Sequence, residues 1–183
     1  DAFITKFNSS GTRIWGTYYG GSKEDWSASC VPENSGNVYL IGTTNSDSTN
    51  AIATTGSFQE TFGGGLSDAF VAAFDVSGQR ISGTYYGASG RDEGEACAIN
   101  AVRSIFIAGV TDSNTSDTIA SDGSHQNLYG GGQWDGFLAR FNMCERSPSV
   151  SITVSNTIIC EGETATLSAS GANSYLWNTN WLG

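Results

Sequence analysis

Basic residues, histidine and proline are scarce in this chain of 183 residues. It has 8 Lys and Arg against 18 Asp and Glu, a net charge of −10, one histidine and 2 prolines. Proteins bind nucleic-acid phosphates mainly through Lys and Arg, so the charge argues against a nucleic-acid partner. It disfavours an anionic membrane surface for the same reason. No apolar run approaches the roughly 20 residues that cross a bilayer, so we expect no membrane insertion.

Glycine and aromatic residues are abundant, and they recur with a fixed period. The chain has 24 Gly and 11% aromatic residues. Residues 1–20, DAFITKFNSSGTRIWGTYYG, return at 68–87 as DAFVAAFDVSGQRISGTYYG and begin again at 135–142 as DGFLARFN. The period is 67, since 68 − 1 = 135 − 68 = 67, and 1–67 align with 68–134 without a gap at 27 identities. This constant spacing predicts a repeat architecture.

Each repeat is expected to supply four strands. Phe3 and Phe7 lie in a run with a two-residue period, which predicts a strand with one aromatic face packed against a neighbour. A turn with glycine at positive φ follows, then a return strand at 13–19, which makes a hairpin. Further strands are expected near 26–33 and at 37–44, the latter apolar on both faces and therefore covered on both sides. The corresponding strands of the second copy are expected near 69–75, 79–86, 94–100 and 104–111.

A long polar connection ends each copy, at 45–67 and 112–134. Such long loops inside a compact unit are often functional or specially packed. Phe62 and Tyr129 each precede a glycine triplet, and we expect them to fold the loop back against the sheet.

The openings of both loops offer side-chain oxygens at alternate positions, which are ligands that calcium takes. The central Gly and distal Glu of an EF-hand loop are missing, however, and a solvated turn is the competing interpretation. These candidate ligands are Asn45, Asp47, Asn50, Asp112, Asn114 and Asp117.

Four-stranded units with both faces buried, repeated radially, are typical of a β-propeller. An open stack of β-sheets is the alternative. The motifs DAFxxxF, TYYGG, the following Asp, NVYLIGTT and GxFQxxxGGG resemble the SBBP repeat, a family named for a seven-bladed β-propeller. The resemblance covers about 1–142. It implies the outer half of one blade, one whole blade and three strands of another, with inner strands near 26–33 and 37–44. We expect further blades ahead of Asp1, because a partial ring leaves apolar faces open.

The pattern changes after Asn142. The segment MCERSPS, 143–149, is expected to be a linker, and alternating apolar residues with Trp177 in 150–183 predict the first half of an Ig-like sandwich. This segment resembles Ig-like or PKD-like modules of large surface proteins from Bacteroidetes-type bacteria. Both ends look cut, so we expect a fragment or a processed piece.

The four cysteines contain no CxxC pair, which argues against zinc. Cys30 and Cys97 occupy the same repeat position, since 97 − 30 = 67, and are expected to be small buried residues. Cys144 and Cys160 flank the predicted linker, and a disulfide between them is a possibility.

The sequence assigns no catalytic, cofactor-binding or metal residue. His125, the single histidine, takes the position of Phe58 in the first copy, so we expect it to replace a packing residue. Asp25 and Asp92 recur with the period, which favours a turn or strand-cap role over a carboxylate pair of a glycosidase. The other carboxylates considered for such a pair are Glu93 and Glu95.

Three tryptophans, Trp15, Trp26 and Trp134, are not repeated. They are candidates for stacking on sugar rings, with packing between repeats as the competing interpretation.

We therefore expect a non-catalytic, extracellular or cell-surface binding and display module of a large bacterial protein. The resemblance implies adhesion, contact with a glycan or a protein, and export through a type IX system. The alternatives are a propeller domain of a polysaccharide-active enzyme, and a structural spacer. No cofactor is expected.

Overall fold

All regular elements that the structure, a computed structural model, describes are β-strands. The chain divides into two compact units, Asp1–Asn142 and Met143–Gly183. Strands that pair within a sheet run antiparallel throughout the described chain. The all-β prediction is therefore confirmed. The residues described are 1–47, 51–114, 119–142, 151–155 and 166–170.

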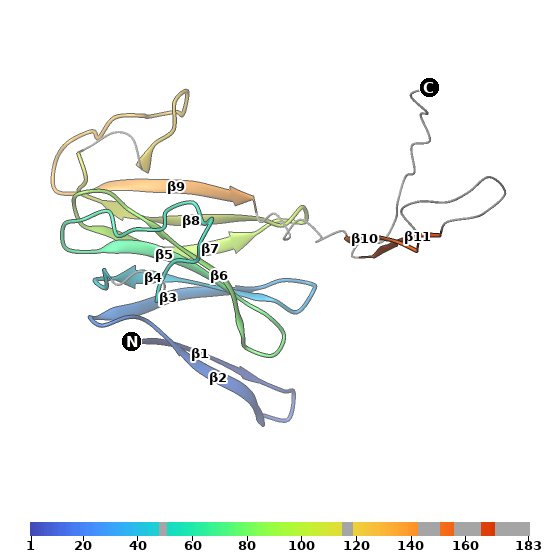
Figure 1. Cartoon of the computed structure of the whole chain (residues 1–183). Helices are drawn as coiled ribbons and strands as arrows, with labels where there is room; N and C mark the ends of the chain where they lie inside the picture. The colour runs from blue at the N-terminus through green and yellow to red at the C-terminus, as the bar shows by residue number, and fades with distance from the viewer. Residues whose placement is uncertain (48–50, 115–118, 143–150, 156–165, 171–183) are drawn as a thin grey trace, which may run out of the picture. The chain divides into compact units, whose positions relative to one another are not determined.

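The first unit contains three sheets made from successive strands (Figure 1). Its strands are β1 (Ala2–Phe7), β2 (Arg13–Tyr19), β3 (Asp25–Pro32), β4 (Val38–Thr44), β5 (Asp68–Phe74), β6 (Arg80–Tyr86), β7 (Asp92–Ile99), β8 (Ser104–Thr111) and β9 (Asp135–Asn142). β1 and β2 form a two-stranded sheet, β3-β4-β5-β6 a four-stranded sheet, and β7-β8-β9 a three-stranded sheet. We call them the first, middle and last sheets.

The middle sheet spans the boundary between the two sequence copies. β4 comes from the first copy and pairs with β5 of the second, with Ile41 opposite Val71. β4 is central and buried along almost its whole length, which agrees with the apolar residues on both of its faces. β3 and β4 of the first copy thus join the β5–β6 hairpin of the second in one sheet.

One face of the middle sheet packs against the first sheet. Ala2 and Ile4 of β1 and Tyr19 of β2 belong to the same buried cluster as Phe70 and Phe74 of β5. The Tyr19 ring lies 4.9 Å from Phe70 and 5.8 Å from Phe74, centroid to centroid. Such tilted and edge-on ring pairs stabilise an interface beyond the area they bury.

The other face of the middle sheet packs against the last sheet through equivalent residues. Tyr86 lies 5.2 Å from Phe137 and 5.6 Å from Phe141. Each of these three residues lies 67 positions after its counterpart in the first junction, since 86 − 19 = 67. The three sheets are therefore stacked face to face by one interface used twice, and Figure 1 shows them layered in chain order.

The predicted aromatic face is buried in the later copies but not in the first. Phe70 and Phe74 are 0% and 2% exposed, whereas Phe3 and Phe7 are 64% and 58% exposed. The physical reason is the order of the stack. The first sheet covers the aromatic face of the middle sheet, and no sheet within the described residues covers the aromatic face of β1.

The prediction that both repeated cysteines are buried is wrong. Cys30 is exposed, because it lies on β3, the edge strand of the middle sheet. Cys97 is half-buried, and its thiol lies 3.4 Å from the Ser29 hydroxyl, where β7 packs against β3. Burial raises the pKa of the Cys97 thiol, which lowers its reactivity as a thiolate.

The second unit is described over one strand pair. β10 (Ser151–Val154) pairs with β11 (Leu167–Ser170). Cys144, Cys160 and Trp177 lie outside the described residues, so the possible disulfide and the Ig-like interpretation stay predictions. Within the residues that the structure describes, there is no apolar helix of bilayer-spanning length.

Candidate functional site

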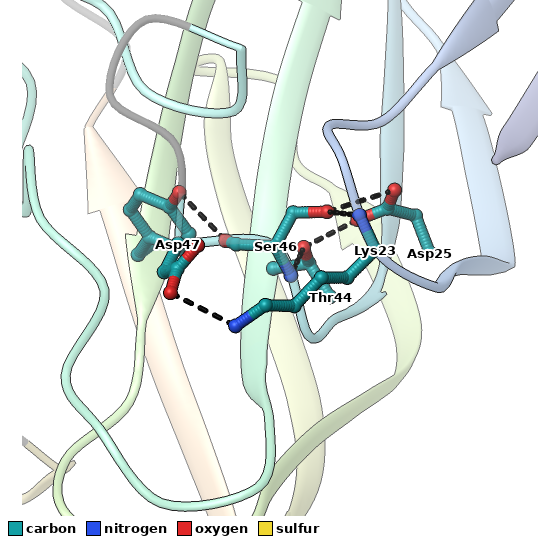
Figure 2. A network of polar contacts seen from close by, with 6 residues as sticks. Lys23, Asp25, Thr44, Ser46 and Asp47 are labelled. Carbon is teal, nitrogen blue, oxygen red and sulfur yellow. Dashed lines mark hydrogen bonds and ion pairs between the residues drawn. The ribbon is translucent and has the colours of Figure 1, made fainter.

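Asp25, the first residue of β3, lies at the centre of a buried polar network (Figure 2). The Thr44 hydroxyl donates to its Oδ1, and the Ser46 hydroxyl donates to its Oδ2 at 3.2 Å. The Gly21 amide also donates to Oδ2, at 2.9 Å. These bonds tie the chain entering β3 to the end of β4, so Asp25 has the strand-cap role predicted from its recurrence.

Asp92 forms the same network at the start of β7. It accepts hydrogen bonds from the hydroxyls of Thr111 and Ser113 and from the Ala88 amide, the last at 2.8 Å. Burial raises the pKa of Asp92, although these hydrogen bonds oppose the rise. Both oxygens already accept protein donors, which favours a structural role over proton transfer to a substrate. Glu93 beside it forms an ion pair with Arg91.

In the first copy a lysine extends the network into the long loop. Lys23 donates its backbone amide to the Ser46 hydroxyl at 2.9 Å, and its ammonium contacts the Asp47 carboxylate at 2.8 Å (Figure 2). This contact lowers the pKa of Asp47. Asp47, a candidate calcium ligand, is thus bound by a cation of the chain itself.

In the second copy the corresponding place is hollow. Gly90 takes the position of Lys23, since 90 − 23 = 67, and Asn114 takes that of Asp47. A cavity of about 540 Å³ opens here, between the β6–β7 connection and the long loop. We call it the loop-end cavity; its lining residues are Ser89, Gly90, Asp112, Ser113, Asn114, Tyr129, Gly132 and Gln133.

The wall of this cavity depends on the glycine. A Cβ atom at Gly90 would lie 2.3 Å from Asp112 Oδ1 and 2.7 Å from Ser113 Oγ, well inside contact distance. The Gly90 amide donates to Ser113 Oγ at 2.8 Å, and the Arg91 amide donates to Asp112 Oδ1 at 2.6 Å. The backbone therefore approaches the loop closely, and the space taken by the lysine side chain in the first copy stays open.

The loop side of the cavity is more polar than its counterpart. Tyr129 replaces Phe62 and Gln133 replaces Leu66 of the first copy. The Tyr129 hydroxyl donates to the Gly132 carbonyl at 3.0 Å. Burial, and after it the charge of Asp135, raises the pKa of Tyr129; a tyrosine hydroxyl is a hydrogen-bond donor at neutral pH even without this shift. The cavity thus presents hydroxyl, amide and carboxylate groups beside an aromatic ring, a combination that orients a polar ligand.

The structure separates the three tryptophans. Trp15 packs between repeats, because its indole Nε1 donates to the Val76 carbonyl at 3.0 Å. Trp134 follows Gln133 of the cavity, and the Arg91 guanidinium carbon lies 5.2 Å from its ring centroid, a cation–π distance. Trp26 is 51% exposed on β3.

The remaining candidates are not brought together. His125 is exposed. Its counterpart Phe58 contacts Phe141 edge-on at 5.6 Å but is 63% exposed, so this position is at most peripheral to the packing. Asn50 and Asp117 lie outside the described residues. Among the residues that are described, no group of three or more His, Cys, Asp or Glu side chains is arranged to hold a metal ion.

Phe62 and Tyr129 were both predicted to fold their long loops back against the sheet, and the structure shows this contact for Phe62 but not for Tyr129. Phe62 packs at the edge of the buried cluster, 6.0 Å from the Tyr85 ring. Tyr129 instead reaches the glycine triplet of its own loop. Within the described residues the last sheet has three strands where the middle sheet has four, and none of the three carries an equivalent of Tyr85.

Comparison with protein-family models gives no match, and comparison with curated proteins gives none either. The functional assignment therefore depends on the geometry of this chain. Sequence reasoning missed Gly90 and Gln133, although both carry a readable signal. Each directly follows a repeated residue, Ser89 or Gly132, and departs from the repeat together with the residue after it, Arg91 or Trp134.

Proposed function

We propose that this chain is a non-catalytic, extracellular binding module and that its loop-end cavity binds an uncharged polar ligand, a glycan. The observation that carries the proposal is the contrast between two equivalent positions. Lys23 binds Asp47 in the first copy, whereas Gly90 and Asn114 leave a polar cavity in the second. A role in binding would favour different residues at these equivalent positions, because packing alone could be achieved with the residues of either copy.

The chemistry of the lining supports a sugar over an ionic ligand. Asn114 and Gln133 each offer an amide that both donates and accepts, and Tyr129 offers a hydroxyl, which matches the paired donors and acceptors of sugar hydroxyls. The one carboxylate, Asp112, already accepts the Arg91 amide. A strongly anionic ligand is disfavoured, because the Asp112 carboxylate and the overall charge of −10 would repel it.

The architecture we propose around this site is a sector of a β-propeller. Its support is the equivalent junction that joins successive antiparallel sheets, each offset by 67 residues, together with the resemblance to the SBBP repeat. In this proposal the loops at one end of the stacked sheets form a rigid recognition surface, and the second unit is an Ig-like or PKD-like module of a surface protein. The carboxylates that a hydrolase would need, Asp25 and Asp92, are occupied by protein donors, which favours binding over turnover.

The experiment is a glycan array on the full chain, followed by calorimetric titration of the best neutral oligosaccharide. The variant Gln133→Leu, which restores the residue of the first copy, is expected to weaken binding about tenfold through a lost polar contact. The matched control Leu66→Gln changes the equivalent position of the first copy and should leave affinity unchanged.

Three outcomes would contradict the proposal. Equal affinity of Gln133→Leu and the parent chain would place the ligand elsewhere. Release of a shortened glycan would support the enzyme interpretation, and a silent array together with silent titrations would support the spacer.

A further inference from the structure

The outward face of the first sheet is an exposed aromatic surface. Phe3 and Phe7 of β1 lie on it with Tyr18 of β2, which pairs with Phe3. Tyr18 is 78% exposed, and Ile14 on the same strand is 55% exposed. We call these four residues the aromatic end face. Contiguous apolar surface of this kind on a folded protein marks an interaction site.

The equivalent surface is covered in both later sheets. Phe70, Phe74 and Tyr85 are the counterparts in the middle sheet, and all are 2% exposed or less, beneath Ala2, Ile4 and Tyr19 of the first sheet. In the last sheet, Phe137 and Phe141 lie beneath Tyr86. The same face is thus covered twice in this molecule, each time by the back of the preceding sheet.

The opposite end of the stack exposes the covering surface. Leu138 of β9 is 73% exposed. Its counterpart in the middle sheet, Val71, is 4% exposed, on the face of β5 whose Ala69 lies against Gly94 of β7. Phe106 and Val110 of β8 share the face of Leu138, because they pair with its strand neighbours Arg140 and Gly136. We name this surface the aliphatic end face after Leu138 and Val110; the ring of Phe106 lies on it as well.

We propose that the aromatic end face of one molecule binds the aliphatic end face of a second copy of this chain. Phe3 and Phe7 correspond to Phe137 and Phe141 on one side of the junction between the middle and last sheets, and Leu138 corresponds to Val71 on its other side. Tyr86, which covers Phe137 and Phe141 in that junction, has no counterpart on the described strands of the last sheet. Each copy carries one of each, so the contact is head-to-tail. Such a heterologous contact builds a ring when its rotation closes and an open chain when it does not.

The test is sedimentation velocity of the full chain over a wide range of concentration. We expect association that grows with concentration. Tyr18→Ser and Leu138→Ser are each expected to weaken self-association about tenfold or more, since each removes a large residue from the centre of the contact. Val102→Ser is the control, because Val102 is 79% exposed on the β7–β8 turn and is not a residue of either end face.

Mixing the two variants distinguishes head-to-tail pairing from other arrangements. Tyr18→Ser keeps the aliphatic end face and Leu138→Ser keeps the aromatic one, so an equimolar mixture should form a one-to-one complex and grow no further. Self-association of Leu138→Ser alone would show the aromatic faces pairing with each other and would overturn the proposal. A parent chain that stays monomeric at every concentration would overturn it as well, in favour of a cover supplied by another repeat of a longer polypeptide.

Discussion

At the scale of single residues, Asp68 at the start of β5 is a buried carboxyl group with one unpaired oxygen. It is fully buried. Its Oδ2 accepts the Gly63 amide at 2.6 Å and the Gln59 side-chain amide at 3.2 Å, while Oδ1 has no hydrogen-bond partner. Burial raises the pKa of Asp68 to about 7, because the charged form loses its hydration and gains few partners in exchange.

The raised pKa predicts a dependence of stability on pH. The folded protein holds the Asp68 proton with a pKa of about 7, against 3.8 for an ordinary aspartate. The free energy of unfolding should therefore fall as pH rises from 4 to 7, by at most about 1.4 kcal/mol per pH unit. Asp68→Asn is neutral throughout and should reduce this slope, as measured by urea unfolding across that range, while Asp92, whose pKa burial also raises, keeps its own contribution.

Asp135 is the control for this prediction, since it lies 67 positions later. It accepts hydrogen bonds from the equivalent residues, Gln126 and Gly130, but is only half-buried. Asp135→Asn should leave the pH slope in place. If Asp68→Asn unfolds with the same slope as the parent chain, the slope arises elsewhere.

At the scale of elements, the hairpin turns are where sequence reasoning succeeded most fully. Gly11 and Gly78 were expected at positive φ, and they lie at 78° and 83°. Asn8 accepts the amides of residues 10 and 12, and Asp75 accepts those of 77 and 79. These turns are local, because four or five residues contain every partner they need.

The two turn glycines provide a matched pair for a stability experiment. A Cβ at Gly11 would meet no atom within 4 Å, whereas at Gly78 it would lie 2.7 Å from the Trp15 ring. Gly11→Ala should cost about 1–2 kcal/mol of unfolding free energy, from backbone strain alone. Gly78→Ala should cost more, because it adds a clash, and urea unfolding measures both.

A background lacking the tryptophan checks the cause of that difference. With Trp15→Ala in place, the two glycine substitutions should cost equal amounts. A difference that persists would show that the clash with Trp15 is not its source.

Two features at this scale could not be predicted from the sequence, the exposure of the cysteines and the loop-end cavity, because both depend on long-range contacts. Cys30 and Cys97 have identical positions in the repeat, yet their exposure depends on which strand packs over each. The loop-end cavity likewise forms between residues 89–90, 112–114 and 129–133, which only the folded chain brings together. The four strands of each repeat, in contrast, follow from period-two patterns and turn residues that are local.

At the scale of the whole molecule, the three sheets form a stack with a single interface at each step. Tyr86 contributes to the second step both its ring and a hydroxyl that donates to the Ile119 carbonyl at 2.6 Å. Tyr19 makes the same bond to Ile52, also at 2.6 Å. Stability in such arrays is approximately a sum of units and nearest-neighbour interfaces.

Removing one interface should therefore uncouple part of the stack. Tyr86→Ala is expected to cost about 3–5 kcal/mol and to let the last sheet unfold before the middle one. Hydrogen exchange read by mass spectrometry should show early loss of protection confined to β7, β8 and β9. Tyr86→Phe, which keeps the ring, should preserve a single transition, and uniform exchange in Tyr86→Ala would contradict the additive description.

The propeller interpretation belongs to this largest scale as well. The repeat predicted that each copy forms equivalent strands, whereas the pairing of strands from one copy with those of the next was only what the resemblance implied. Ring closure depends on the angle added at every step, a quantity that no residue pattern encodes.

The hydrogen bonds of Asp25 and Asp92 have a consequence for how such a chain changes over generations. The hydrogen-bond partners of Asp25 reappear 67 residues on around Asp92, and the middle sheet takes two strands from one copy and two from the next. A crossover between misaligned copies of the gene would thus insert or excise whole 67-residue lengths and return each polar group to a suitable partner. An insertion or deletion of any other length would leave a buried carboxylate without its hydrogen-bond donors. Descendants of this chain should therefore differ in length by multiples of 67 residues.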